Sequence, residues 1–221
     1  MAELVVAWDL ETCPRPLETL GPAARRRLDM LMARDAARAG NTYRPVNETE
    51  LAQRRSRVMS THPSLCWICC AGFARKGSSR ALYTATPAGE REVLVDLWGL
   101  VAQLPSNTQF VSFNGKGFDV PVLKARSLAL GVAPTRDALL DDHPYRHRPH
   151  ADLWSLLGRH PVTLAELCEI AGIETPKGSM KGSDVAAAVA AGRIEDVARY
   201  CEGDCMASLQ AFVAARAFLR P

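Results

Sequence analysis

The stretch VVAWDLET, residues 5–12, decides the first element of the fold. A short apolar run that ends in acidic residues and Pro14 is typical of a buried central strand. Side chains two positions apart in a strand point to the same face, so Asp9 and Glu11 are expected to lie side by side. Two neighbouring carboxylates repel each other, and a cation between them would relieve the repulsion. Acidic residues also end many strands without binding anything, so this pair alone is a weak indication of a metal site.

A second acidic residue follows another predicted strand. Residues 108–113 (TQFVSF) have the composition of a strand, and Gly115 and Gly117 permit a tight turn after it. Phe118 and Asp119 then open the next predicted helix. Taken alone, Asp119 could simply cap that helix and Phe118 could belong to the core.

The third segment lies on the last predicted helix, which runs from about Ile194 to Leu219. It reads Tyr200-Cys201-Glu202-Gly203-Asp204. Positions i and i+4 share one face of a helix, so Tyr200 and Asp204 are expected to stand together. Gly203 costs a helix roughly 1 kcal/mol relative to alanine, which indicates that backbone or ligand comes close beside Asp204. The pair alone is equally compatible with a structural role.

Together and in this order, the three segments resemble the three motifs of the DEDD exonucleases, in their tyrosine subclass. They are most similar to the predicted exonucleases related to the proofreading domain of family B DNA polymerases. The resemblance runs from Val5 to about Arg220 and includes the tail around residues 182–185 (GSDV). It implies an RNase H-like fold and a two-metal nuclease. It also implies a catalytic set of four acidic residues and one tyrosine, which stands where the other subclass carries histidine: Asp9, Glu11, Asp119, Asp204 and Tyr200.

The proposed ligands are all carboxylates, and hard oxygen ligands favour Mg²⁺ or Mn²⁺. Two such ions can stabilise both the attacking and the leaving oxygen of a phosphodiester. Asp9 is expected to bridge the ions, while Glu11 and Asp204 complete the site that binds the attacking water and Asp119 acts on the second ion. Tyr200, with an ordinary pKa of about 10, is a poor base and is expected to orient the water.

Substrate contacts are expected close to the acidic residues and in the glycine-rich loop before the last helices. Bases, the 3′-hydroxyl and phosphates are the expected targets, and each residue has an alternative role in capping, core packing or a solvated loop. The expected substrate-binding residues are Leu10, Thr12, Asn114, Phe118, Lys177 and Lys181.

The order of predicted elements indicates an α/β fold in which helices flank a mixed central β-sheet. The 221 residues suit a single domain, 1–221, with a helical and loop insertion at about 15–61. Ten arginines against five acidic residues lie between Arg15 and Arg57, so this segment could attract phosphates. On charge alone, a solvated helical face is the favoured interpretation.

Seven cysteines, no basic leader and no apolar stretch of about 18 residues indicate a cytoplasmic protein with free thiols and no membrane contact. The run from Cys66 to Cys70 has no second pair of metal ligands and is expected to pack in the core.

The sequence therefore predicts a metal-dependent 3′–5′ exonuclease that acts on nucleic acid, with a single-stranded DNA end as the expected substrate. An RNA-trimming exoribonuclease with the same site is the alternative. A non-catalytic nucleic-acid-binding module is less favoured, because such a module would lose at least one of the four acidic residues. A partner polymerase or repair protein stays open.

Overall fold

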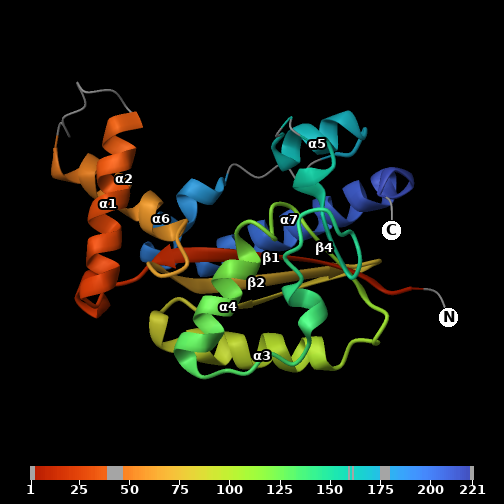
Figure 1. Ribbon diagram of the computed structural model, residues 1–221, viewed down its shortest axis with the longest axis horizontal. Helices are drawn as coiled ribbons and strands as arrows, with labels where there is room; N and C mark the ends of the chain where they lie inside the picture. The colour runs from red at the N-terminus through yellow and green to blue at the C-terminus, as the bar shows by residue number, and fades with distance from the viewer. Residues whose placement is uncertain (1–2, 39–46, 159, 161, 175–179, 220–221) are drawn as a thin grey trace.

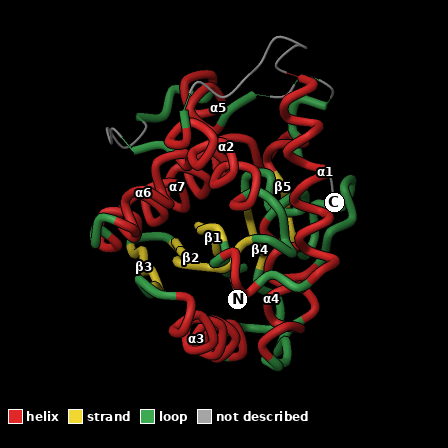
Figure 2. The backbone as a smooth tube through the Cα atoms, turned by 90° about the vertical axis from the view of Figure 1, so that its left-hand side faces the viewer, coloured by secondary structure: helices red, strands yellow, loops and turns green. Residues whose placement is uncertain are grey.

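A five-stranded sheet in the order β3-β2-β1-β4-β5 forms the centre of the protein. The structure, a computed structural model, describes residues 3–38, 47–158, 160, 162–174 and 180–219. Figure 2 looks along the sheet and shows the five strands side by side in this order. The strands are β1 (Val5–Pro14), β2 (Cys66–Arg75), β3 (Ser78–Tyr83), β4 (Gln109–Ser112) and β5 (His150–Asp152).

The sheet is mixed, as predicted. Strand β1 is antiparallel to β2 and parallel to β4, and β4 is parallel to β5. Asp9 lies opposite Gly72 of β2, and Val5 lies opposite Gln109 of β4. The prediction that the first strand ends at the acidic residues is wrong, because β1 continues through them to Pro14 while pairing with β2.

Two layers of helices cover the sheet. Helices α3 and α4 lie on one face, and α5, α6 and α7 lie on the other (Figures 1 and 2). The α-helices are α1 (Pro22–Arg38), α2 (Glu48–Ser60), α3 (Glu90–Ala102), α4 (Asp119–Leu130), α5 (Leu164–Ile170), α6 (Val185–Ala190) and α7 (Ile194–Ala215). The short 3₁₀ helices are η1 (Leu17–Thr19), η2 (Pro87–Gly89), η3 (Asp137–Leu140), η4 (Leu153–Ser155), η5 (Gly182–Asp184) and η6 (Arg216–Phe218).

The alternation of side chains along β1 assigns each residue to one of these layers. Trp8 and Leu10 are buried in the apolar cluster formed with α3 and α4. Ala7 belongs to the cluster on the opposite face, with residues of α5 and α7. Asp9 and Glu11 lie two and four positions after Ala7, so their side chains point to the same face of the sheet as Ala7. Strand β1 therefore presents both carboxylates toward α7.

The segment between β1 and β2 forms a helical pair at the end of β1 that lies far from the N-terminus (Figure 1). Leu28 of α1 and Met59 of α2 share a small apolar cluster, and the Thr12 hydroxyl donates a 2.6 Å hydrogen bond to the carbonyl of Ser60. Helix α2 begins after Asn47, whose side chain accepts the N–H of Glu50.

A capping box formed by Thr163 and Glu166 begins α5. The sequence did not predict β5 or α6. Strand β5 has three residues and α6 has six, too few to show a period of two or of 3.6. Within the described ranges, no helix has the length and apolar character needed to cross a membrane.

Candidate active site

Asp9 stands at the centre of a cluster of carboxylates. Burial raises its pKa well above the ordinary value, and Asp119, Glu11 and Asp204 each raise it further through their charges. Residues that are distant along the chain therefore lie within electrostatic range of one another. The structure brings all four predicted acidic residues to one place.

Glu11 lies beside Asp9 and is 9% exposed. Its carboxylate accepts no hydrogen bond from the described part of the chain. Burial raises the pKa of Glu11 strongly, and the charge of Asp204 is the next largest cause. A buried carboxylate without a partner is costly unless a cation or a proton neutralises it.

Asp119 begins α4, directly after the turn that follows β4. Its Oδ1 accepts a 2.8 Å hydrogen bond from the backbone N–H of Leu10. Burial raises the pKa of Asp119 to about 7, against the opposing effect of that hydrogen bond. The side chain thus joins α4 to the middle of β1, which is a role beyond capping its own helix.

Tyr200 and Asp204 come from α7 and lie one turn apart, as predicted. The Tyr200 hydroxyl lies near Asp204 and lowers the pKa of that carboxyl, against the larger raising effect of burial. Burial, followed by the charges of Glu11 and Asp204, raises the pKa of Tyr200. Tyr200 is therefore a neutral phenol at the edge of the carboxylate cluster.

Cys201 is a neighbour of the site that the sequence did not identify. Its Sγ lies 3.6 Å from both the Oδ2 and the carbonyl oxygen of Asp9. Asp9, Glu11 and Cys201 each offer one ligand atom, and these atoms lie within 4.8 Å of one another. This contact could not be predicted from the motif, because in a helix the residue after Tyr200 points about 100° away from it.

The expected contact between the Leu10 side chain and substrate is wrong. Neighbouring strand residues point to opposite faces, so Leu10 is buried against α3 and α4, away from Asp9 and Glu11. Only its backbone N–H reaches the site, through Asp119. The Thr12 hydroxyl is already engaged with Ser60 in the helical pair.

The other expected substrate-binding residues lie in different surroundings. Asn114 adopts a φ of 62° and places its side-chain oxygen close to Gly117, where a Cβ would lie 2.7 Å from it. Phe118 is partly buried against the α3–α4 cluster. Lys181 is exposed at the start of η5, and Lys177 lies outside the described residues.

Asp152 organises the turn that carries Asn114. Its Oδ1 accepts the backbone N–H groups of Asn114 and Trp154 at 2.7 and 3.0 Å, and its Oδ2 accepts that of Lys116 at 2.9 Å. These contacts could not be found in the sequence, because two of the three donors lie 38 and 36 positions away.

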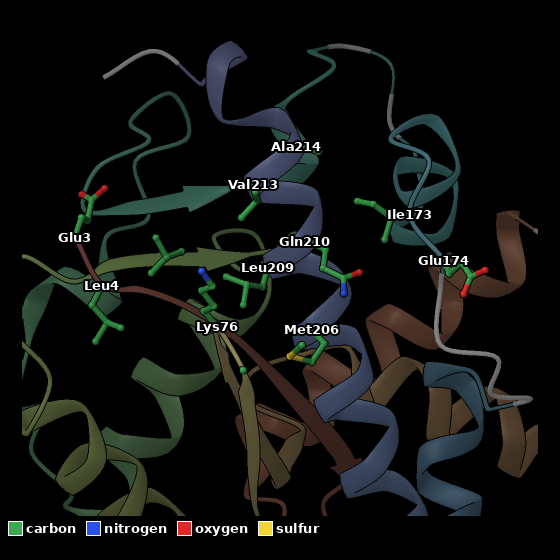
Figure 3. A pocket seen from close by; sticks show the side chains of 12 residues that line it. Glu3, Leu4, Lys76, Ile173, Glu174, Met206, Leu209, Gln210, Val213 and Ala214 are labelled. Carbon is green, nitrogen blue, oxygen red and sulfur yellow. The ribbon is translucent and has the colours of Figure 1, made fainter.

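A separate hollow lies along the C-terminal half of α7 (Figure 3). Met206, Leu209 and Val213 line it, together with Lys76 and the residues that begin β1. None of the four acidic residues lines this hollow. The carboxylate cluster and the hollow are therefore distinct features of the molecule.

Comparison with protein families gives a match over residues 64–218, to the predicted 3′–5′ exonucleases related to the exonuclease domain of PolB. The chain belongs to this family. The match includes the positions of Asp119, Tyr200 and Asp204 and begins after Asp9 and Glu11. The family is described as one of predicted 3′–5′ exonucleases, and no curated protein matches the chain.

One solved structure shows the fold. The family B DNA polymerase from the archaeon Pyrobaculum calidifontis aligns with a TM-score of 0.65 and 18% identity, over 98% of this chain and 25% of the polymerase. Escherichia coli exonuclease I in complex with a dT13 oligonucleotide aligns at 0.43 and 14% identity, over 90% of this chain and 42% of that protein. The match to the polymerase shows that the chain has the predicted RNase H-like fold, and the chain spans a quarter of the polymerase's length.

Proposed function

We propose that this exonuclease removes nucleotides from the 3′ end of single-stranded DNA, using two Mg²⁺ or Mn²⁺ ions held by Asp9, Glu11, Asp119 and Asp204. The observation that carries the proposal is the convergence of these four carboxylates, in which three of them raise the pKa of the fourth. Folding alone gives no reason to bury four mutually repelling acidic groups together. A site that binds cations gives such a reason, because the cations neutralise the repulsion.

The residues present fit divalent cations. Glu11 is nine-tenths buried and accepts no hydrogen bond within the described chain. No positive side chain is among the causes that act on the pKa of Asp9 or Glu11. All four proposed ligands offer oxygen, which favours Mg²⁺ or Mn²⁺, while the nearby thiol of Cys201 is protonated because its pKa is raised.

When bound, the ions would lower the pKa of water and stabilise the charge on the leaving 3′-oxygen. Asp9 is the proposed shared ligand, because the charges of the other three carboxylates all act on its pKa. Glu11 and Asp204 would hold one ion on the α7 side, and Asp119 would act from the start of α4. Tyr200 would orient the attacking water through its hydroxyl, because its raised pKa excludes a role as a base near neutral pH.

The α1–α2 segment supplies positive charge beside this site. Arg27 and Arg34 are exposed on α1, two helical turns apart, and form no ion pair within the described residues. Burial lowers the pKa of His62, and the charge of Arg27 lowers it further, so the two side chains are near each other. His62 lies two positions after Ser60, whose carbonyl accepts the hydrogen bond from the Thr12 hydroxyl. We assign these arginines to the phosphates of the incoming strand.

The proposal is tested with a 5′-labelled DNA oligonucleotide in Mg²⁺, Mn²⁺ or chelator. The expected product is a ladder that shortens from the 3′ end, requires the metal and is lost in Asp204→Ala. Asp196→Ala is the matched control, since Asp196 is an exposed acidic residue on the same helix that pairs with Arg193 and Arg199. An RNA oligonucleotide of the same sequence, run in parallel, shows whether RNA is the better substrate.

A further inference from the structure

Trp154 differs from the other tryptophans of the chain. Trp8, Trp67 and Trp98 are at most 4% exposed, and each donates its indole N–H to a partner within the protein: His150, the carbonyl of Pro14 and Ser127. Trp154 is 41% exposed, and its indole N–H has no partner among the described residues. A large aromatic ring with an unused donor at the surface is typical of a binding contact.

Trp154 lies at the edge of the sheet where the parallel strands β4 and β5 end, level with the middle of β1. It belongs to η4, which follows β5 directly. Its backbone N–H and that of Asn114 donate to the same oxygen of Asp152, so Trp154 lies beside the turn that leads to Asp119. The charge of Asp152 in turn raises the pKa of Asp119.

Helix α7 approaches η4 from the other side. Leu153, the residue before Trp154, is buried in the apolar cluster that contains Cys205, and Cys205 directly follows Asp204. Trp154 is therefore attached to a rigid element that contacts both the Asp119 turn and the Asp204 helix. Two strand spacings separate β5 from β1, which places η4 roughly 10 Å from the strand that carries Asp9.

We propose that Trp154 stacks on a base of the single-stranded nucleic acid and so positions the 3′ end over the carboxylate cluster. The inference rests on the proposed function. Stacking on an aromatic ring suits a nuclease that accepts any sequence, because every base has a π-face. A paired base inside a duplex is stacked on its neighbours and does not present that face. Trp154 thus favours single strands over duplexes, and it acts as a positioning residue that does not touch the metal.

Intrinsic fluorescence tests this contact apart from catalysis. The full-length protein is titrated with a short oligothymidylate that carries phosphorothioate linkages, in Ca²⁺, so that cleavage does not remove the ligand. We expect quenching in the wild type and no quenching in Trp154→Phe, because the remaining tryptophans are buried. A blunt duplex of the same length should quench little. Equal quenching in the wild type and in Trp154→Phe would overturn the proposal.

Kinetics provide the second readout. Trp154→Ala should raise KM for single-stranded DNA by roughly tenfold and change kcat much less, and Trp154→Phe should recover most of the loss. Phe218→Ala is the matched control, since Phe218 is 76% exposed in η6, next to Arg216, which pairs with Glu3 before the start of β1. An unchanged KM in Trp154→Ala would contradict the stacking role. If the wild type neither binds nor cleaves, the proposed function itself fails.

Discussion

A Cβ atom added at Gly72 would lie 2.7 Å from Sγ of Cys201 and 3.1 Å from its backbone carbonyl oxygen. Gly72 lies opposite Asp9 in the sheet, so the missing side chain lets α7 approach β2 where the acidic residues meet. The position of Tyr200 and Asp204 over Asp9 depends on this close approach.

Gly72→Ala should displace α7 and separate Asp204 from Asp9. We expect the free energy of unfolding to fall by about 1–3 kcal/mol, because the clash includes backbone. The rate of cleavage should fall at least tenfold. Denaturation curves and single-turnover kinetics measure the two effects. Gly99→Ala is the control, since a Cβ there meets nothing within 4 Å and alanine favours the helix. Normal activity in Gly72→Ala would show that the close packing is not needed.

Tyr200→Phe removes the hydroxyl beside Asp204 and leaves the ring in place. We expect cleavage to slow about 10²-fold with little change in KM, because the hydroxyl orients water without holding the strand. Its pH profile should keep the shape of the wild-type profile, since the raised pKa keeps Tyr200 protonated throughout the working range. Lost pH dependence in the variant would instead identify Tyr200 as the titrating group.

The metal-free protein should lose stability as the pH rises. The pKa of Asp119 is about 7 in the folded protein because of burial, against about 4 for an unfolded carboxyl, so the folded state binds more protons between these values. Its contribution to stability is therefore present below pH 4 and is lost as the pH rises through about 7. The raised pKa values of Asp9 and Glu11 also make the folded state less stable as the pH rises.

Melting temperatures measured in chelator from acidic to neutral pH test this expectation. Adding Mg²⁺ at neutral pH should restore the lost stability, since bound cations offset the repulsion. Asp119→Asn keeps the oxygen that accepts the Leu10 N–H and should flatten the pH dependence. A melting temperature that rises with pH in chelator would contradict the repulsive cluster.

The arginines of α1 should bind the strand through its phosphates. Arg27→Glu combined with Arg34→Glu should weaken binding of single-stranded DNA and reduce the slope of log K against log salt by about 0.7 for each lost contact. The control is Arg91→Glu, an exposed position on α3 across the sheet. Fluorescence anisotropy at several salt concentrations makes the measurement. Equal salt slopes in the double variant and the wild type would leave α1 without a role in binding.

Much of the fold could be predicted from local patterns. The capping box at Thr163, the period of α3 and the apolar start of β1 each depend on residues close in sequence. The four acidic residues and Tyr200 were predicted because each lies in a short motif. The short β5 and the continuation of β1 past Glu11 depend on pairing with other strands. The spacing of apolar residues within one segment does not show such pairing.

The surroundings of the site were harder to predict for the same reason. The contacts that hold Leu10 and Thr12 could not be predicted, because their partners, the α3–α4 core and Ser60, are distant in sequence. Cys201 and Trp154 gave no local signal, although the first lies against Asp9 and the second shares Asp152 with Asn114. Contacts of this kind are set by the tertiary fold.

The most direct test of the account is the cleavage of 5′-labelled single-stranded DNA by the wild type and by Asp9→Asn, with and without Mg²⁺ or Mn²⁺. Asn keeps the shape of the side chain and removes the charge that would bind both ions. We predict a metal-dependent 3′ ladder in the wild type and its loss in a folded Asp9→Asn protein. Cleavage by Asp9→Asn at the wild-type rate, or cleavage in chelator, would contradict the account.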